Sequence, residues 1–218
     1  MSIRTLLVDD HTMFRQALRV MLELEEDIEV VGELGDGSKI VETVALLRPD
    51  VVVMDVSMPG MNGIEATRAL RAKHPQIKVV ALSASNYKQF IIEMMGAGAL
   101  AYVVKSAAGD QLVYAINSAA KGKTYLCPES ATLLADSNGL GLGPGGAATP
   151  LESRRLARRE TAVLQLLAQG KSSPQIGKLL HIASSTVDVH RRNIMRKLEL
   201  HNVAELTKYA ILVGIADL

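Results

Sequence analysis

The sequence predicts an α/β domain built on an open parallel sheet, followed by a smaller domain made only of helices. Over the first 121 residues, five short runs rich in valine, isoleucine and leucine alternate with segments of helical spacing. Strands that are continuously hydrophobic are typical of a parallel sheet covered by helices on both faces. Right-handed crossovers between such strands produce a doubly wound sandwich. After a glycine-rich stretch, the rest of the chain shows helical spacing alone.

The individual elements follow from these patterns. The five runs predict strands at residues 3–8, 28–34, 51–54, 77–82 and 99–104. Between the strands, apolar residues recur at helical spacing, as at Ile40, Val44 and Leu47. In the last part of the chain, four further helices are expected at about residues 158–169, 174–181, 184–199 and 203–214.

Composition marks the boundary between the domains. Residues 137–150, SNGLGLGPGGAATP, are dense in glycine, include two prolines and cannot bury a core, so they predict a flexible linker. We therefore expect a first domain at residues 1–122, a linker at 123–150 with room for a short helix in PESATLLADS, and an all-α domain at 151–218.

The net charge of +1 conceals opposite charges in the two parts of the chain. Residues 1–150 contain 13 Lys and Arg against 17 Asp and Glu, whereas residues 151–218 contain 11 against 6. An acidic part joined to a basic part suggests two tasks, and the basic part is the one expected to bind an anionic partner.

Several polar side chains directly follow the predicted strands. Asp9 and Asp10 follow the first strand, Asp55 the third, Ser83 the fourth and Lys105 the fifth. Because ligands of open parallel sheets bind beyond the carboxyl ends of the strands, we expect these side chains to share one crevice. Taken singly, each has an ordinary explanation, such as a turn, a helix cap or a solvated lysine. Their coincidence at corresponding strand ends favours a functional site.

The chemistry of this set is that of phosphoryl transfer. Three neighbouring carboxylates repel one another and need a cation, and their oxygen atoms suit Mg²⁺. One carboxylate at the mouth of such a site can attack phosphorus and form an aspartyl phosphate. The metal and a lysine would neutralise the phosphoryl oxygens, and the Ser83 hydroxyl would donate a hydrogen bond to the group. We therefore interpret Asp55, which follows the buried run VVVM, as the residue that is modified.

The segments LLVDDH, VVVMDVSMPGMNGIE, VVALSAS and GALAYVVKSA resemble the receiver domain of two-component response regulators, over residues 3–121. This resemblance implies a flavodoxin-like fold with a five-stranded sheet. It also implies that Asp55 accepts a phosphoryl group from a histidine kinase. An enzyme that hydrolyses phosphate esters is a poorer match, because such enzymes usually carry a second aspartate two residues after the nucleophile, where this chain has Ser57.

The resemblance also implies roles for the other pocket residues. The Mg²⁺ ligands would be Asp10, Asp55 and the carbonyl of Ser57, with Asp9 assisting. Ser83 and Tyr102 match the family's switch pair, in which the aromatic ring repacks inward after phosphorylation, and Lys105 matches its lysine. The remaining alternative is an atypical regulator that acts through DNA or protein contacts without being phosphorylated, which the complete pocket disfavours.

The basic part of the chain contains a candidate DNA-reading helix. In SSTVDVHRRNIMRKLEL, the apolar residues Val187, Ile194 and Leu198 lie at helical spacing and are expected to face a core. The stretch RRNIMRK, residues 191–197, supplies four positive charges on the remaining surface. Such a helix fits the major groove of DNA, which is about 12 Å wide, although a solvated basic face is the plainer interpretation of charge alone.

The segment LARRETAVLQLLAQGKSSPQIGKLLHIASSTVDVHRRNIMRKLELHNVAEL resembles the LuxR/FixJ/NarL-type DNA-binding domain, over about residues 156–214. With the receiver, this makes the chain similar to a NarL/FixJ-type transcriptional response regulator. The DNA contacts that the resemblance implies are Ser185, Thr186, Asp188, Val189, Arg192 and Arg196. In the family the last helix pairs two DNA-binding domains, which here implicates Leu206, Ala210 and Ile211.

Four positions depart from the family pattern: Ala157, Ala183, Asp188 and Val203. Ala157 stands where threonine often caps the first helix, and Asp188 stands where lysine is frequent. An acid at position 188 repels phosphate but is able to accept a hydrogen bond from the amino group of cytosine.

The resemblance implies several partners and a compartment. The partners are double-stranded promoter DNA, a sensor histidine kinase and a second copy of the chain when it is active or bound to DNA, with RNA polymerase as a further candidate. The start MSIRTLLVDDHTMF is unlike a secretory signal, and no apolar run approaches the ~18 residues of a membrane span. The single cysteine, Cys127, fits a reducing compartment. We therefore expect a cytoplasmic protein without a membrane partner.

Overall fold

The computed structural model describes residues 2–84, 86–107, 109–135, 156–198, 200–213 and 215–216. Contacts between residues divide the chain into two compact units, residues 1–138 and 139–218, which are described separately below. The glycine-rich stretch expected to be a linker lies outside the described residues. In the part of the chain that is described, no helix has the length and apolar character needed to cross a membrane.

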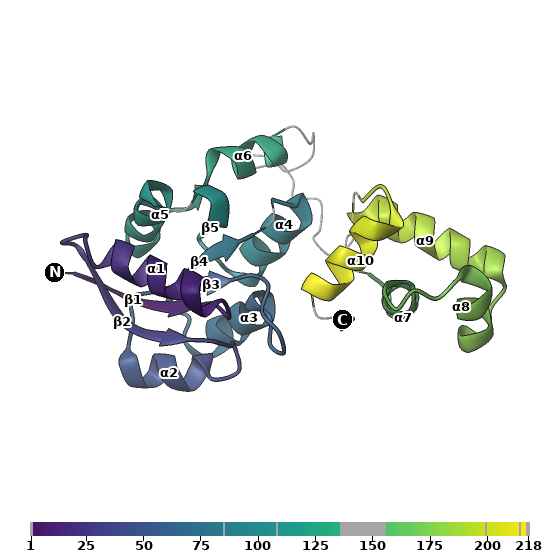
Figure 1. Ribbon diagram of the computed structural model, residues 1–218, viewed down its shortest axis with the longest axis horizontal. Helices are drawn as coiled ribbons and strands as arrows, with labels where there is room; N and C mark the ends of the chain where they lie inside the picture. The colour runs from purple at the N-terminus through teal and green to yellow at the C-terminus, as the bar shows by residue number, and fades with distance from the viewer. Residues whose placement is uncertain are drawn as a thin grey trace. The chain divides into compact units, whose positions relative to one another are not determined.

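The first unit is built on a parallel sheet (Figure 1). Its strands are β1 (Ile3–Val8), β2 (Ile28–Leu34), β3 (Val51–Asp55), β4 (Lys78–Ser83), β5 (Ala101–Val104) and β6 (Tyr125–Leu126). They lie in the order β2-β1-β3-β4-β5-β6, and each pair of neighbours is parallel. The chain winds one way from β1 to β2 and the other way from β3 onward, so the strand order reverses between β1 and β3. The α/β class and the five expected strands are confirmed.

Strand β6 was not expected, and it lies at the edge of the sheet beside β5. It comprises two residues, which are too few for any periodicity to reveal. Helix α6 (Pro128–Ala135) follows it and contacts α4 and β5. The Ser130 hydroxyl lies 3.0 Å from the Cys127 sulfur and donates a hydrogen bond of 2.9 Å to Asn86, in the loop after β4. The chain beyond residue 122 therefore continues the fold of the first unit.

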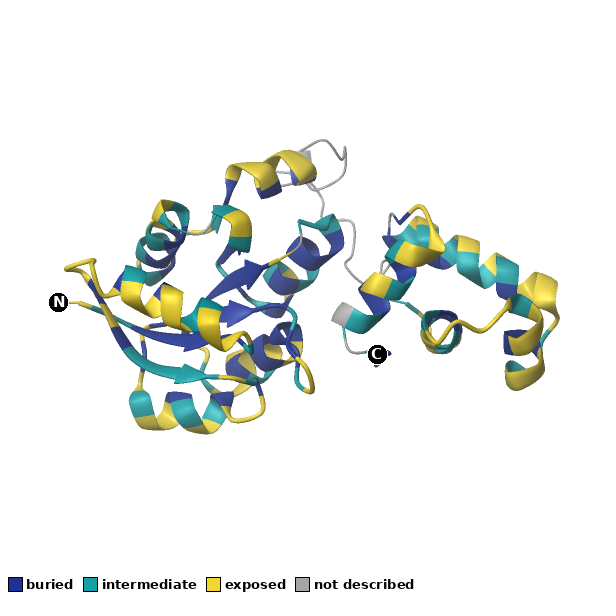
Figure 2. Cartoon of the chain, in the orientation of Figure 1, coloured by how far each residue is buried: buried dark blue, intermediate teal, exposed yellow. Residues whose placement is uncertain are grey.

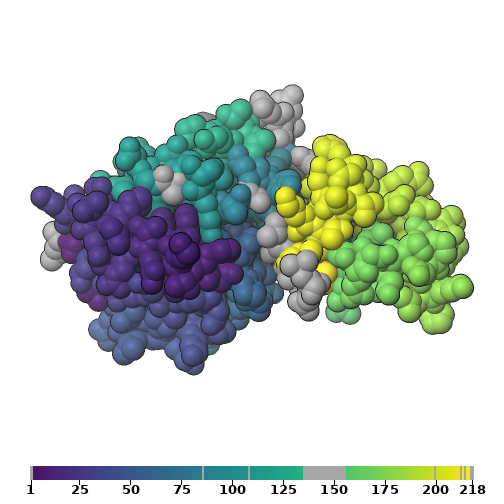
Figure 3. Space-filling view, in the orientation of Figure 1, coloured from purple at the N-terminus to yellow at the C-terminus, as the bar shows by residue number. Residues whose placement is uncertain are grey.

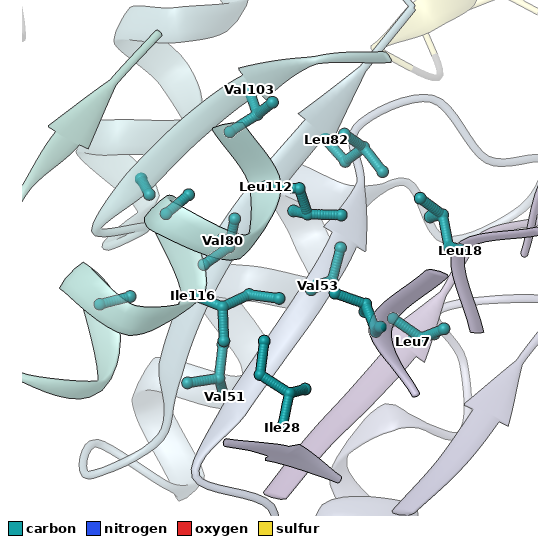
Figure 4. Packing of buried hydrophobic residues seen from close by; sticks show 14 of the residues in the cluster. Leu7, Leu18, Ile28, Val51, Val53, Val80, Leu82, Val103, Leu112 and Ile116 are labelled. Atoms are coloured by element: carbon teal, nitrogen blue, oxygen red, sulfur yellow. The ribbon is translucent and has the colours of Figure 1, made fainter. Parts of the chain in front are cut away.

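Helices cover both faces of the sheet (Figures 1 and 2). They are α1 (Thr12–Leu22), α2 (Ile40–Leu47), α3 (Gly63–Lys73), α4 (Lys88–Ala97) and α5 (Asp110–Ala120). Side chains alternate between the two faces along each strand, so Leu7, Val53 and Val80 pack with Leu18 of α1 and Ile116 of α5 in one cluster (Figure 4). Every residue of β3 is buried (Figure 2), as expected for a central strand covered on both sides.

The second unit consists of α7 (Arg158–Ala168), α8 (Ser173–Leu180), α9 (Ser184–Leu198) and α10 (Val203–Leu212). Helix α7 packs on α9 and α10, and α8 packs on α9. The turn between α8 and α9 is tight: a Cβ on Gly177 would lie 2.7 Å from the carbonyl oxygen of Ile182, so a side chain there would force the two helices apart. This all-helical unit with a helix-turn-helix confirms the expected fold class.

Helix α7 begins at Arg158 although its N-cap residue, Ala157, has no side-chain acceptor. The Glu160 carboxylate accepts a hydrogen bond of 2.7 Å from the Ala157 backbone N–H, which supplies one half of a capping box. The helix therefore starts in place without the threonine that is common at this position.

Candidate functional site

Two carboxylates and one ammonium meet at the carboxyl edge of the sheet. Asp9 follows β1, Asp55 ends β3, and Lys105 follows β5. The Lys105 Nζ lies 2.7 Å from Asp9 Oδ2 and 2.7 Å from Asp55 Oδ2. Asp9 is 2% exposed and Asp55 1% exposed, so water contributes little to the stability of either charge. Strands β1 and β3 are neighbours with the reversal of strand order between them, which is why their ends deliver these acids to one place.

Backbone groups hold both carboxylates in position. The Ser57 N–H donates a hydrogen bond of 3.1 Å to Asp55 Oδ1, and the His11 N–H donates one of 2.8 Å to Asp9 Oδ1. The N-terminus of α3 lies against the backbone of Asp55, because a Cβ on Gly63 would overlap the Asp55 carbonyl oxygen. Only glycine permits this approach, so the packing of α3 fixes the backbone that carries Asp55.

Burial and neighbouring charge oppose each other in this pocket. Burial raises the pKa of Asp55 to about 6, although the Lys105 ammonium acts to lower it. For Lys105, burial acts to lower the pKa, but the charges of Asp55 and Asp9 outweigh it and the pKa is raised. The lysine therefore stays charged, and Asp55 is a carboxylate at neutral pH that lacks full compensation.

The pocket fits a divalent cation. Carboxylate oxygens of Asp9, Asp10 and Asp55 and a ring nitrogen of His11 lie within 4.8 Å of one another. Among the described residues, the buried Asp10 Oδ1 has no hydrogen-bond partner. The His11 Nδ1 lies 2.9 Å from it and balances its charge only when the imidazole is protonated. An acceptor left open beside two other carboxylates is the environment that a hard cation with oxygen ligands requires.

Two of the predicted pocket residues form a hydrogen-bonded pair beside the acids. Ser83 ends β4, Tyr102 lies on β5, and both are fully buried. Their hydroxyls share a hydrogen bond, and burial raises the pKa of Tyr102, so the phenol stays neutral. Tyr102 thus lies inside the protein in this structure, and its repacking after phosphorylation stays a prediction. A hydroxyl has one donor and two acceptor sites, so Ser83 can donate to a group on Asp55 if it accepts from Tyr102.

The structure places the predicted DNA-contacting residues on the outer face of α9. Ser185, Thr186, Val189, Arg192 and Arg196 are exposed, whereas Val187, Ile194 and Leu198 are buried. Val189, Arg192 and Arg196 line a shallow hollow of about 350 Å³ together with Asn193, which sequence reasoning missed. The Asn193 side chain accepts a hydrogen bond of 3.1 Å from Arg196, so it orients one of the two arginines.

Asp188 has partners inside the second unit. Its Oδ1 accepts a hydrogen bond of 2.8 Å from the Ser173 hydroxyl of α8 and lies 3.5 Å from the Arg191 guanidinium. These contacts join α8 and α9 and balance the negative charge of Asp188 near the outer face of α9. The acid therefore has a structural reason to be present that does not involve cytosine.

Helix α10 shows which of its residues are available to a partner. Leu206 and Ala210 are fully buried and Ile211 is partly exposed. Leu206 and Ala210 therefore lie in the interior and offer no surface in this structure. Ala204 and Lys208 are exposed and lie seven and three positions before Ile211, on the same helical face.

Comparisons with known proteins agree with both units. Residues 5–117 match the model of the response regulator receiver domain, and residues 154–210 match that of the bacterial regulatory proteins of the luxR family. The chain is 37% identical over 208 residues to the transcriptional regulatory protein LiaR of Bacillus subtilis, covering 95% of this chain and 96% of that protein. It is 34% identical over 200 residues to the nitrate/nitrite response regulator protein NarL of Escherichia coli, covering 92% and 91%.

Among solved structures, the chain is similar to RcsB in a structure of two RcsB dimers bound to two parallel DNAs. The TM-score is 0.73, the identity is 24%, and the match covers 98% of this chain and 100% of that one. At this level of identity the likeness concerns the fold.

Proposed function

The chain belongs to the LuxR family of two-component response regulators, and from that premise we propose that phosphorylation of Asp55 controls its binding to DNA. As a member of this family it is a DNA-binding transcriptional regulator, and it is a phosphoacceptor rather than an enzyme.

The observation that carries the proposal is the Lys105 ammonium placed 2.7 Å from both Asp9 and Asp55. Asp55 attacks the phosphorus of a phosphohistidine on the sensor kinase, so that a P–O bond forms as the P–N bond breaks. Lys105 then pairs with a phosphoryl oxygen as negative charge builds on the group. The aspartate that phosphatases usually carry at the position of Ser57 is not needed as a general acid here. The histidine takes a proton from solvent and leaves as a neutral imidazole.

The acidic cluster would hold Mg²⁺ through Asp10, Asp55 and the Ser57 carbonyl, with Asp9 assisting. The open acceptor on Asp10 and the crowding of three carboxylates support this assignment. When bound, the metal supplies neutralisation of the phosphoryl oxygens. His11 lies in the same cluster, but its imidazole is largely exposed and its ring nitrogen is a softer ligand than Mg²⁺ prefers.

The phosphoryl group is sensed by the hydroxyl pair beside it. New acceptor oxygens on Asp55 take a hydrogen bond from the Ser83 hydroxyl, which rearranges the hydrogen bond that this hydroxyl shares with Tyr102. The change falls on the face formed by α4 and β5. This coupling passes the state of Asp55 to the surface of the receiver.

The DNA-binding domain reads promoter DNA through the outer face of α9, with Ser185, Thr186, Val189, Arg192 and Arg196 toward the groove. We place the receiver at residues 1–122 and the DNA-binding domain at 151–218; of the segment 123–150 that was expected to link them, β6 and α6 belong to the fold of the first unit. A homodimer joins through the exposed face of α10 at Ile211, beside Ala204 and Lys208. The active protein works in the cytoplasm, where its DNA target lies, with RNA polymerase as a further partner.

The decisive test compares the wild-type chain with Asp55→Asn. Acetyl phosphate with Mg²⁺ is expected to add one phosphoryl group to the wild-type protein, measured by intact mass, and none to the variant. Phosphorylation is expected to increase affinity for a promoter fragment at fixed salt in the wild type alone. Equal labelling of the two proteins would overturn the assignment of Asp55. DNA binding and cellular output that ignore the substitution would instead support a regulator that works without phosphorylation.

A further inference from the structure

We propose that the first turn of α1 supplies two adjacent positioning residues for the Asp55 site: Arg15 fixes the Asp9–Asp10 pair for the metal, and Phe14 fixes the ammonium of Lys105. The inference deepens the proposed function and rests on it. Helix α1 packs against the sheet beside the pocket, and the N-terminal part of the chain that contains it forms the surface toward the viewer in Figure 3.

Arg15 is bound at both ends of its guanidinium group. Its Nη1 donates a hydrogen bond to the main-chain carbonyl of Asp9, and its Nε donates one of 3.0 Å to Glu33 of β2. The Arg15 side chain is 13% exposed, so these contacts are shielded from water. The backbone N–H of Asp9 donates a separate hydrogen bond of 3.1 Å to the carbonyl of Leu34. Both backbone groups of Asp9 are therefore held.

Glu33 keeps the arginine in this position. Its second oxygen accepts a hydrogen bond of 2.9 Å from Arg19, one turn further along α1. The hydrogen bond from Arg19, aided by the one from Arg15, outweighs the effect of burial and lowers the pKa of Glu33. Glu33 is therefore an ionised acid at neutral pH, and its charge-assisted hydrogen bond helps to orient the planar guanidinium of Arg15.

The effect reaches the metal ligand through the peptide bond. The carbonyl that Arg15 binds belongs to the peptide group between Asp9 and Asp10. Because a peptide group is planar, fixing that carbonyl fixes the direction in which the backbone enters Asp10. Asp10 carries one of the buried oxygens that have no hydrogen-bond partner among the described residues. Arg15 therefore sets the orientation of the carboxylate that is left open for a cation.

Phe14 acts on the other charged group of the pocket. Its ring centroid lies 4.8 Å from Lys105 Nζ, within the roughly 6 Å range of a cation–π contact. The ring is partly buried and packs against the main core cluster, which restricts its movement. Asp9 and Asp55 bind the ammonium on two sides and the ring closes a third. The ammonium is thereby kept where a phosphoryl oxygen on Asp55 would meet it.

The plainer interpretation is that Phe14 is a core residue and Arg15 a stabilising surface ion pair. The two interpretations differ in what substitutions change. A structural role predicts lower stability with the binding and transfer steps intact. Positioning roles predict that substitution of Arg15 lowers the affinity for Mg²⁺. Substitution of Phe14 is predicted to lower the rate of phosphoryl transfer without changing the affinity for Mg²⁺.

The first experiment titrates the unphosphorylated full chain with Mg²⁺ alone by calorimetry. Arg15→Lys keeps the charge but cannot bridge Asp9 and Glu33, and it is expected to weaken the affinity about tenfold, as loss of a supporting contact to a metal ligand typically does. Glu33→Gln should shift it in the same direction by a smaller factor. Arg19→Lys is the matched control, because Arg19 binds Glu33 without touching Asp9. An unchanged affinity in Arg15→Lys, or an equal loss in Arg19→Lys, would overturn the role of Arg15.

The second experiment measures the rate of labelling by acetyl phosphate at saturating Mg²⁺. Phe14→Leu retains an apolar side chain but removes the π-face, and it is expected to slow labelling about threefold to fivefold at unchanged Mg²⁺ affinity. Phe14→Tyr retains the ring and should restore the rate. Wild-type labelling in Phe14→Leu, or an equal defect in Phe14→Tyr, would overturn the role of Phe14.

Failure of the proposed function gives a different result. If the wild-type chain is not labelled on Asp55 at all, phosphorylation control is wrong, whereas the Mg²⁺ titration of the unphosphorylated variants still decides the role of Arg15. Thermal unfolding of each variant identifies any change that reflects loss of the fold.

Discussion

The two units each contain a lysine bound to a buried carboxylate, and the pairs differ in what surrounds them. In the receiver, Lys105 lies 2.7 Å from Asp55, with a second acid, Asp9, at the same distance. In the DNA-binding domain, Lys197 of α9 lies 2.6 Å from Glu160 of α7. Glu160 also accepts the Ala157 N–H at 2.7 Å, so its charge is matched by donors.

The difference shows in the pKa of each acid. For Asp55, burial prevails over Lys105 and raises the pKa to about 6. For Glu160, burial acts in the same direction, but the hydrogen bonds from Lys197 and from the Ala157 N–H outweigh it and the pKa is lowered. The same pair of groups therefore stores unfavourable charge in one unit and stabilises helix packing in the other. Asp55, the residue proposed to react, carries a charge that its neighbours do not fully compensate, whereas the charge of Glu160, which joins two helices, is compensated.

The largest effect is expected when the satisfied pair is broken. Lys197→Met leaves the Glu160 charge nearly buried without its ammonium, and it should lower the free energy of unfolding of the helical unit by about 2–3 kcal/mol. Calorimetry of the full chain measures this unit's transition. Lys178→Met is the matched control, since Lys178 is exposed on α8 and should change stability by less than about 0.5 kcal/mol. Equal effects of the two substitutions would remove the distinction between the pairs.

Replacing each acid by its amide sharpens the comparison. Glu160→Gln should cost about 1–2 kcal/mol, because the charge-assisted hydrogen bond to Lys197 is lost. Asp55→Asn removes one of three crowded carboxylates, and in the absence of Mg²⁺ it should leave the receiver unchanged or stabilise it by about 1 kcal/mol. The opposite signs are checked by denaturation of both variants with a chelator present. A clear loss of stability in Asp55→Asn would show that the three neighbouring carboxylates do not destabilise the receiver.

Acid should affect the two units in opposite directions. The folded-state pKa of Glu160 lies below its ordinary value of 4.5, so its stabilising contribution is complete above that pH and is lost as the pH falls through the lower value. The folded-state pKa of Asp55 is raised from 3.8 to about 6, so its ionised form destabilises the receiver above pH 6. Without metal, the receiver should therefore gain about 1 kcal/mol between pH 7 and pH 5.

The response to pH is measured as the difference between the wild type and Asp55→Asn. The gain on acidification should vanish in the variant if Asp55 is its source. A gain that persists in the variant would assign the titration to another group in the pocket.

The smallest effect concerns the charge balance on the face of α9 that is proposed to contact DNA. Asp188→Asn frees Arg191, which lies 3.5 Å from the acid, for contact with a phosphate. One added phosphate contact should steepen the plot of log affinity against log salt concentration by about 0.9. Ser173→Ala, which breaks the hydrogen bond to Asp188 without changing charge, should leave that slope unaltered. If Asp188→Asn instead loses its preference for one G·C pair, Asp188 contacts cytosine, and its role is not limited to the contacts with Ser173 and Arg191.

Much of the receiver was predictable because its chemistry follows from topology. Parallel strands place their carboxyl ends at one edge, so Asp9, Asp55 and Lys105 were expected to meet before any coordinates were known. The register of β1 and β3 turns that expectation into contacts at hydrogen-bonding distance. The contacts of Phe14 and Arg15 with the pocket were not predicted, because an arginine that binds a main-chain carbonyl leaves no pattern in the sequence.

The DNA-binding domain was less predictable in detail. Helical spacing identifies an apolar stripe on α10 but does not say which part faces α7, so Leu206 and Ala210 were expected at a dimer surface and lie in the interior. Asp188 was judged by its charge alone, and its partner Ser173 lies fifteen residues away on another helix. Contacts between helices depend on crossing geometry, which spacing along one helix does not encode.

The two-residue strand β6 has a practical consequence for anyone who isolates the first unit. A fragment cut at residue 122 would lack the strand that pairs with β5 and would also lose the buried Cys127, Ser130 and Leu134. An unprotected strand edge recruits other chains. Aggregation of such a fragment would then be caused by the position of the truncation. A fragment that extends to residue 135 retains β6 and α6, so the edge of β5 stays paired.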